Sequence, residues 1–304
     1  MVWQTKKGSD YLLRSYYDKS GQRRQRSLGV RSEQTETLKR DYENSRDEAK
    51  ARFKEIDAVL ARQAGINRAL ALGRVPMPSA RIIRALDDIG ALGAGIRVVG
   101  TNAIYAYEAA AGVVVDAGIT ATGDIDLLFD SRGGLRFVIS EDISEPSLLA
   151  VLQGVDKTFH RTAQSFRAEN AEGYMVDLIK PMRNPPWKPD RTQLGADDAD
   201  IVASEIEGLV WLENAPVFEA IAIDERGFPL RIVAADPRVF AAHKHWVSQR
   251  VDREPIKRRR DADQAVVVGA IVGQYLTYLP FEIGDLKMLP KTVAEAAAHL
   301  FVTP

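Results

Sequence analysis

The alternation of apolar and polar residues predicts that the chain opens with a β-hairpin and continues as a long helical region. Residues 11–17 and 22–30 have the pattern of two strands around the turn 18–21, where Asp and Gly favour a tight reversal. Residues 34–72 are rich in Ala, Glu, Lys and Arg, with apolar residues near helical spacing, which predicts one or two long helices. Their apolar stripe either packs against the rest of the chain or forms a dimer seam, and its short, irregular repeat favours packing.

The pattern then changes to short apolar strands that alternate with helices and glycine turns. The segment 74–78 interrupts the first helical region, and Ser79 is expected to cap a helix over residues 80–89. Strands are predicted at 96–99, 125–129, 135–140 and 174–179, a helix at about 102–111, and a second hairpin from 218–223 and 230–234. These elements predict a mixed α/β (α+β) core.

The C-terminal part of the chain is predicted to be helical. Asp236 followed by Pro237 has the pattern of an N-cap with proline at the first helical position, and another helix is expected to begin near Pro255. The pattern divides the chain into a hairpin with charged helices (1–90), an α/β domain (91–234) and a helical subdomain (235–304).

Composition restricts the chemistry that the chain can perform. Its 304 residues, 45% hydrophobic and 27% charged, are typical of a globular protein. No run approaches the roughly 20 apolar residues that span a bilayer, and the first ten residues lack the apolar centre of a secretory signal, so a cytoplasmic location without membrane association is expected. With no cysteine and four histidines outside any ligand spacing, a metal would be held by carboxylates, which favours Mg²⁺ or Mn²⁺.

Charge is uneven along the chain. The net charge of -1 does not favour bulk nucleic-acid binding. Two basic groups nevertheless stand out: one comprises Arg23, Arg24 and Arg26, and the other lies between Lys244 and Arg260. Either group can meet phosphates.

Two acids separated by one apolar residue begin the strand predicted at 125–129. Alternation places Asp124 and Asp126 on one face, where their repulsion favours a divalent cation between them. Asp177 interrupts another apolar strand, which indicates either an edge position facing water or a functional acid. If the two strands are neighbours, the three carboxylates converge as a two-metal site requires.

The turn at Gly100-Thr101 lies between a predicted strand and a predicted helix. Glycine lets the backbone approach a phosphate there, and the free N–H groups of a first helical turn attract anions. An ordinary strand-to-helix turn has the same pattern. The chain contains neither the P-loop nor the dinucleotide-binding glycine motif at this place, which argues against both.

The Asp-x-Asp spacing recurs at Asp198/Asp200 and at Asp261/Asp263, where polar or helical surroundings favour a solvated face. A second interpretation concerns Asp261 alone. On the helix expected from Pro255, one face carries four polar residues that can border a cleft: Lys257, Arg260, Asp261 and Gln264.

One helix earlier, Lys244 can reach a triphosphate as a point charge. The alternative for each of these residues is a surface salt-bridge lattice. His243 and His245 flank Lys244 and face different sides of their helix, so no catalytic role is assigned to either.

The order of Gly100-Thr101, a helix, Asp124-x-Asp126 and a strand-borne Asp177 resembles the DNA polymerase β-like nucleotidyltransferase superfamily over residues 96–180. The resemblance implies that Gly100 and Thr101 contact the triphosphate and that Asp124 and Asp126 bind both metal ions. It also implies that Asp177 binds one metal ion and helps to deprotonate the attacking hydroxyl.

A whole helix separates the glycine turn from the paired acids, which is longer than in minimal members of the superfamily. This form looks like a bacterial branch of stand-alone nucleotidyltransferase-fold proteins. The stretch from Lys244 to Arg260-Asp261 is also similar to a segment of the abortive-infection type nucleotidyltransferase toxins.

The sequence therefore predicts a metal-dependent nucleotidyltransferase that moves a nucleoside monophosphate from an NTP to a hydroxyl and releases pyrophosphate. The expected nucleotide contacts are Gly100, Thr101, Lys244, Lys257, Arg260 and Asp261. The acceptor stays open among RNA, especially a tRNA 3′ end, a protein and a small molecule. The alternatives are a non-catalytic nucleotide- or partner-binding module and the toxin of a toxin-antitoxin pair, and a homodimer through the N-terminal helices is a further expectation.

Overall fold

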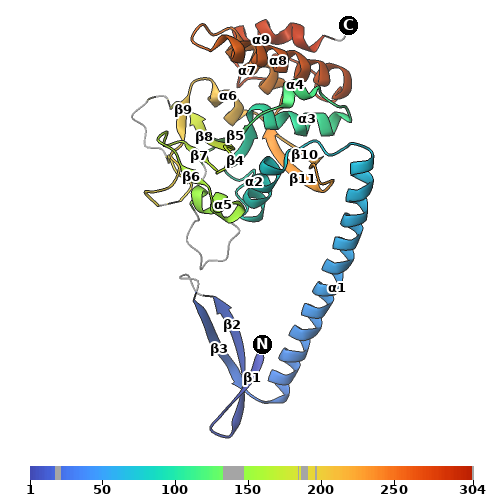
Figure 1. Cartoon of the computed structure of the whole chain (residues 1–304), viewed down its shortest axis with the longest axis vertical. Coiled ribbons are helices and arrows are strands. Elements are labelled where there is room, and N and C mark those ends of the chain that lie inside the picture. Colours follow the sequence, from blue (N-terminus) through green and yellow to red (C-terminus); the bar gives the residue numbers. More distant parts are fainter. Residues whose placement is uncertain (18–21, 133–146, 184, 186–190, 196, 303–304) are drawn as a thin grey trace. The chain divides into compact units, whose positions relative to one another are not determined.

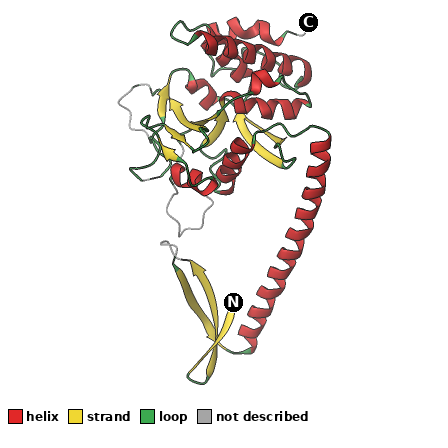
Figure 2. Ribbon diagram, in the orientation of Figure 1, coloured by secondary structure: helices red, strands yellow, loops and turns green. Residues whose placement is uncertain are grey.

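The computed structural model describes residues 1–17, 22–132, 147–183, 185, 191–195 and 197–302. These form two compact units, the first comprising Met1–Ile66 and the second the described residues from Asn67 onward. Each unit combines strands with helices, which confirms the predicted mixed α/β class (Figure 2). The division of the chain at residues 90 and 234 stays a prediction.

The first unit contains a three-stranded antiparallel sheet in the order β1 (Val2–Lys6), β2 (Ser9–Tyr17), β3 (Arg23–Val30). The predicted hairpin corresponds to β2 and β3 and is confirmed, whereas its turn at 18–21 lies outside the described residues. Strand β1 was not predicted. Four of its five side chains are exposed, so it lacks the apolar alternation that identifies a half-buried strand.

The charged region after the hairpin folds as one helix, α1 (Glu33–Ala69). Its charges are balanced along its length and include the ion pair Lys39–Glu43 at 3.0 Å, one helical turn apart. The predicted apolar stripe is exposed, most of all at Phe53, whose side chain is 73% accessible, and also at Tyr42 and Ile56. A dimer seam along α1 stays a prediction.

The second unit is built on an eight-stranded mixed sheet (Figure 1). Its order is β10 (Val217–Ile223), β11 (Pro229–Ala235), β4 (Ile96–Val99), β5 (Asp124–Phe129), β8 (Met175–Pro181), β7 (Arg167–Glu169), β6 (His160–Arg161), with β9 (Ser204–Ile206) pairing the end of β8. The structure confirms the strands predicted at 96–99, 125–129 and 174–179 and the hairpin of β10 and β11. The strand predicted at 135–140 lies outside the described residues.

The two faces of the central strands bury different sets of apolar side chains. Ile125 and Leu127 of β5 belong to a core cluster that includes α2 (Met77–Asp88) and α5 (Leu148–Val155). Leu128 points to the other face, where the apolar cluster includes α6 (Leu209–Asn214), α7 (Pro237–Ser248), α8 (Pro255–Tyr275) and α9 (Lys291–Ala297). Because side chains alternate along a strand, Asp124 and Asp126 share the face of Leu128.

The remaining short helices are η1 (Gly100–Ala103), α3 (Ile104–Ala111), α4 (Ala117–Thr120) and η2 (Ala298–Phe301). The predicted cap of α7 is confirmed, since the Asp236 carboxylate accepts a hydrogen bond from the backbone N–H of Arg238 at 2.8 Å. Helix α8 begins at Pro255 as predicted. None of the described helices combines the length and the apolar character that crossing a membrane requires.

The prediction that Ser79 caps its helix is wrong. Helix α2 begins three residues earlier than predicted, at Met77, with Pro76 at the N-cap, because Pro78 fits the first turn of a helix and does not prevent it. Ser79 is fully buried, and its hydroxyl lies 2.7 Å from the Tyr174 hydroxyl.

The solvated-face interpretation of Asp198/Asp200 is wrong for Asp200. Its side chain is fully buried, and its carboxylate accepts hydrogen bonds from the backbone N–H groups of Leu148 at 3.0 Å and Leu149 at 2.9 Å. These donors belong to the first turn of α5. Asp200 thus stabilises a helix N-terminus from a loop about 50 residues away in sequence.

Candidate functional site

Three carboxylates lie on one face of two neighbouring parallel strands. Strand β5 pairs with β8 in a register that places Asp126 opposite Asp177, and Asp124 lies two residues before Asp126. This is the strand pairing on which their predicted convergence depended. The face they share is the one covered by the C-terminal helices.

Asp126 is the carboxylate with the most unusual environment. Among the described residues it accepts no hydrogen bond and makes no ion pair. Burial and the charge of Asp124 raise its pKa to about 7, with Asp177 adding to the rise and the cations Lys244 and Arg253 opposing it. A half-buried acid left without a partner beside other acids is a position where a cation is strongly favoured.

Asp177 is held by an arginine that sequence reasoning missed. Arg167 of β7 is the register partner of Asp177, and its Nε and Nη2 atoms donate to the two carboxylate oxygens, each at 2.6 Å. Hydrogen bonding to Asp177 raises the pKa of Arg167, and the charges of Asp124 and Asp126 add to this rise. Arg167 therefore balances the carboxylate group in the absence of another cation.

We predict that Arg167→Ala destabilises the protein without divalent cations by about 3 kcal/mol, because it leaves the buried Asp177 uncompensated. Saturating Mg²⁺ should recover most of this loss, so that Mg²⁺ raises the melting temperature of the variant more than that of the wild type. Thermal unfolding with EDTA and with Mg²⁺ measures both effects. An equal Mg²⁺ shift in both proteins would show that Arg167 does not substitute for a cation.

The donor chemistry of the carboxylate group suits a hard divalent cation. Among the described residues no group of three or more His, Asp or Glu side chains is arranged as a ready metal cage. The Asp126 carboxylate nevertheless has no partner in the described part of the chain. There, the half-buried Asp124 carboxylate accepts a single hydrogen bond, from the nearby Thr122 hydroxyl. Oxygen ligands of this kind are the ones that Mg²⁺ or Mn²⁺ prefers.

The glycine turn closes directly against Asp126. Gly100 has φ +62°, a conformation that L side chains rarely adopt, and a Cβ atom there would overlap the Asp126 carboxylate. Val99, immediately before it, is the register partner of Asp126 on β4. The predicted turn Gly100-Thr101 therefore lies against Asp126, on the strand next to β4.

We predict that Gly100→Ala both displaces Asp126 and weakens divalent-cation binding. Gly112 is a matched control, since it has φ +66° but open space around the position of a Cβ atom. Gly112→Ala should cost about 1 kcal/mol from backbone strain alone, and Gly100→Ala at least about 1 kcal/mol more. Urea unfolding measures the stability of each variant. The shift of the unfolding midpoint on adding Mg²⁺ measures how well the carboxylates bind the divalent cation. Equal behaviour of both variants would contradict the contact.

Thr101 belongs to a buried polar network behind the turn. Its hydroxyl oxygen accepts hydrogen bonds from Arg260 and Gln264 of α8, each at 3.0 Å. Arg260 also donates to the Ala121 carbonyl at 2.5 Å and Gln264 to the Ile119 carbonyl at 3.0 Å, on the segment that leads into Asp124. Arg260 and Gln264 thus fix the turn and the approach to β5 together.

Lys244 and Asp261 meet between α7 and α8. The Lys244 ammonium donates to the Asp261 carboxylate at 2.7 Å, and Arg253 donates to its other oxygen at 2.9 Å. Asp261 is only 2% exposed, so the solvated-face interpretation of Asp261/Asp263 is wrong for Asp261. The more accessible residue of that pair is Asp263.

Lys257 lies apart from this group. Its side chain is 55% exposed and forms an ion pair at 3.2 Å with Glu254, which is itself 70% exposed. Of the six residues predicted to contact the nucleotide, Gly100, Lys244 and Asp261 line the pocket described next, whereas Thr101, Lys257 and Arg260 do not. A contact of Lys257 with a triphosphate stays a prediction.

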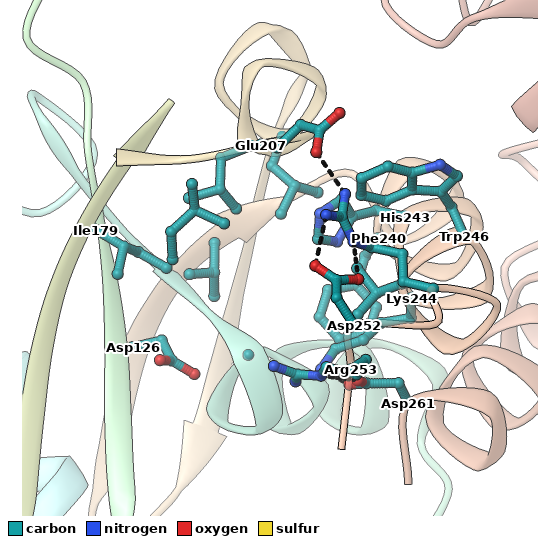
Figure 3. Close-up of a pocket in the computed structure, with 17 residues that line it drawn as sticks. Asp126, Ile179, Glu207, Phe240, His243, Lys244, Trp246, Asp252, Arg253 and Asp261 are labelled. Carbon is teal, nitrogen blue, oxygen red and sulfur yellow. Dashed lines mark hydrogen bonds and ion pairs between the residues drawn. The ribbon is translucent and has the colours of Figure 1, made fainter. Parts of the chain in front are cut away.

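A cavity of about 340 Å³ separates Asp126 from the basic residues of α7 and α8. Figure 3 shows the Asp126 carboxylate facing the Arg253 guanidinium across this space, with Asp261 beside Arg253. The walls between these ends are apolar and include Ile179 and Phe240. The pocket thus has the Asp126 carboxylate at one side and, at the other, Lys244 and Arg253 paired with Asp261. An acid and cations that face each other in this way can bind the metal ion and the phosphates of a metal-bound polyphosphate.

The far end of the pocket is aromatic. The His243 ring lies 6.0 Å from both Trp211 and Trp246, and Arg250 lies 4.8 Å above the Trp246 ring. Burial lowers the pKa of His243 to about 3, so its imidazole is neutral. The structure thus buries one of the two histidines flanking Lys244 within an aromatic cluster.

The sequence did not indicate the role of Arg167 or the aromatic cluster. Arg253 belongs to the basic group noted between Lys244 and Arg260, but its pairing with Asp261 was not predicted. A turn pattern at Asn170-Ala-Glu-Gly173 directly before β8 was available and indicates a hairpin that would pair a residue near 167 with Asp177. No comparable local pattern predicts the pairing of Arg253 with Asp261. Arg253 lies in the turn before α8, whereas Asp261 lies within α8, eight residues later.

Comparison with known proteins adds one finding. The model of a protein family described as Nucleotidyltransferase matches residues 77–286, which is more than half of the chain and contains every residue of the pocket. No curated protein and no solved structure matches the chain.

Proposed function

Because this chain belongs to the nucleotidyltransferase family whose model spans residues 77–286, we propose that it transfers a nucleoside monophosphate from an NTP to a hydroxyl acceptor. The acceptor oxygen forms a bond to the α-phosphorus, the bond from that phosphorus to the bridging oxygen breaks, and pyrophosphate leaves with that oxygen. The acceptor proton passes to a base. The observation that carries this proposal is that Asp126, with Asp124 and Asp177 beside it on the sheet, faces Lys244 and Arg253 across one pocket.

Asp124, Asp126 and Asp177 are the proposed ligands of Mg²⁺ or Mn²⁺. When bound, such an ion neutralises charge on the phosphates and on the attacking oxygen. The raised pKa of Asp126 supports this role, because it results from burial and from a local excess of negative charge that a divalent cation would relieve.

The triphosphate is proposed to lie between the glycine turn and α7. Gly100 brings the backbone against Asp126 without a side chain in the way, and Thr101 follows in the same turn. Lys244 and Arg253 supply positive charge on the opposite wall, where Asp261 fixes both. Arg260 acts behind the turn as a positioning residue, through its hydrogen bond to Thr101.

Asp177 is the proposed acceptor of the hydroxyl proton. In the structure Arg167 donates a charge-assisted hydrogen bond to each of its two oxygens. Exchange of Arg167 for a metal ion at one oxygen would free the other for the proton.

Incubating the protein with each α-³²P-labelled NTP, Mg²⁺ or Mn²⁺, and total cellular RNA and protein tests this function. Label is expected with the wild type and not with the double variant Asp124→Ala/Asp126→Ala, and the labelled band identifies the acceptor as RNA or protein. Absence of label with intact metal-dependent NTP binding by calorimetry would favour a non-catalytic binding module. Absence of both would overturn the triphosphate site.

RNA and protein are the proposed acceptor classes, and a toxin of a toxin-antitoxin pair would apply the same chemistry to a host acceptor. Growth arrest on expression of the wild type, but not of the double variant, would indicate the toxin. A homodimer through α1 is also proposed, because the exposed residues Tyr42, Phe53 and Ile56 follow one stripe. Light scattering should show a dimer for the wild type and a monomer for Phe53→Lys/Ile56→Lys.

A further inference from the structure

The three-stranded sheet of the first unit concentrates positive charge. Residues 1–32 contain eight Lys and Arg against two Asp, a net charge of +6, although the whole chain has a net charge of -1. The helix that follows is neutral, so the rest of the chain is acidic. A basic segment of this kind in an acidic protein indicates a polyanionic partner for that segment.

Arginines stand opposite one another on neighbouring strands of this sheet. In the register of β2 and β3, Arg14 faces Arg26 and Tyr16 faces Arg24, and all four side chains are exposed. Among the described residues, neither Arg14 nor Arg26 has an acidic partner. Like charges directly opposite on a sheet are destabilising, so the pair costs stability unless an anion lies across both.

Among the described residues of 1–32 the one acidic residue is Asp10, and it does not compensate this face. Asp10 accepts the Thr5 hydroxyl at 2.6 Å and pairs with Arg31 at 3.4 Å, at the other end of the sheet. These hydrogen bonds lower the pKa of Asp10, and its carboxylate is paired with Thr5 and Arg31 rather than with Arg14 or Arg26. Arg14 and Arg26 are therefore available for phosphates.

We propose that this face of the sheet, with Arg14, Tyr16, Arg24 and Arg26, binds double-stranded DNA. Two antiparallel strands lie about 4.8 Å apart and fit the major groove of B-form DNA, which is about 12 Å wide. The major groove of A-form RNA is too deep and narrow for such a ribbon. Binding of single strands would need several free aromatic rings on which bases can stack. On this face Tyr16 is exposed, but the Trp3 ring is covered by the Arg31 guanidinium, which lies 5.4 Å from the ring centroid. The face therefore does not favour single strands.

This binding does not depend on the transfer reaction, because the residues that carry it belong to the first unit and the proposed active site to the second. The test uses the full chain with EDTA and without NTP. Fluorescence anisotropy is measured with a mixed-sequence DNA duplex of about 20 base pairs, the matching RNA duplex and the single strands, over about 50–200 mM salt.

We expect the DNA duplex to bind most tightly, with an affinity that falls steeply as salt rises. Arg14→Ala/Arg26→Ala should weaken binding at least about tenfold and reduce the slope of log K against log salt by about 2, one for each lost phosphate contact. Arg14→Lys/Arg26→Lys should retain the slope. Circular dichroism checks the fold, which these exposed side chains should not alter.

The matched control is Lys287→Ala/Lys291→Ala, which removes two exposed positive charges from the second unit. It should bind DNA as the wild type does. Three results would each overturn the proposal. They are an unchanged salt slope for Arg14→Ala/Arg26→Ala, an equal effect of the control variant, and tighter binding of the RNA duplex or of single-stranded RNA than of the DNA duplex. Loss of nucleotidyl transfer in the same preparations would leave the DNA measurement unaffected, so the two proposals fail separately.

Discussion

Asp126→Asn is expected to abolish turnover and at the same time to stabilise the metal-free protein above neutral pH. The variant keeps the shape of the side chain but removes the charge that a metal ion needs, so we expect activity to fall by about 10³-fold or more. The gain in stability follows from the environment of Asp126, where ionisation is opposed by burial and by Asp124 and Asp177.

The sign of the pH dependence can be derived from the pKa of Asp126. Because its pKa in the folded protein is about 7, against 3.8 for the free side chain, the folded state binds the proton more tightly. The stability contributed by this proton is fully present below pH 3.8 and is lost as the pH rises through 7. The amide of the Asp126→Asn variant does not titrate and has no such loss, so near pH 8 the variant should be more stable than the wild type by on the order of 3 kcal/mol.

Urea unfolding near pH 5 and near pH 8, in EDTA, measures this difference. The gain should be small at the lower pH and large at the higher one, and Mg²⁺ at the higher pH should stabilise the wild type but not the variant. Asp263→Asn serves as the control, because Asp263 belongs to the Asp261/Asp263 pair on α8 and lies outside the pocket. A gain that does not change with pH would contradict a protonated Asp126, and full activity of the variant would remove Asp126 from the reaction.

The acids of the site could be predicted because each lies on a strand whose pattern is visible in the sequence. Asp124 and Asp126 precede an apolar run, and Asp177 interrupts another, so alternation alone assigns the faces. The order of the strands could not be predicted from alternation. That β5 and β8 are direct neighbours in parallel register follows from the folded sheet, and only this register brings Asp126 beside Asp177.

The cations of the site were harder to predict, since their roles depend on contacts between elements. Spacing on one helix correctly grouped Arg260 and Gln264, which both reach Thr101. The same spacing placed Lys257 in the group, although its side chain is exposed and pairs with Glu254. Helical periodicity predicts which residues share a face but not how deeply each of them is buried. Lys257 lies one turn nearer than Asp261 to the solvent-exposed start of α8.

Lys244→Met is expected to impair the reaction more than the fold, and Asp261→Asn to impair both. Removing Lys244 leaves the Asp261 carboxylate paired with Arg253 at 2.9 Å, so we expect a loss of only about 1 kcal/mol in stability. Removing the charge of Asp261 leaves Lys244 and Arg253 side by side without their anion, which should cost about 3 kcal/mol. In kcat/KM, Lys244→Met should lose about 10²-fold, because a cation facing Asp126 across the pocket is absent when the phosphates bind.

A double-mutant cycle on Lys244 and Asp261 separates support of the fold from contact with the nucleotide. The coupling in stability should be about 1–3 kcal/mol, since the two side chains meet at 2.7 Å in a buried site. Calorimetry with a non-hydrolysable NTP measures the nucleotide affinity of each variant. Lys287→Met, which removes an exposed positive charge, is the control. If Lys244→Met lowers stability but leaves nucleotide affinity and turnover unchanged, Lys244 serves only to fix Asp261. If affinity falls while Arg253 still holds Asp261, the ammonium itself meets the triphosphate, because no other contact of the pair has been removed.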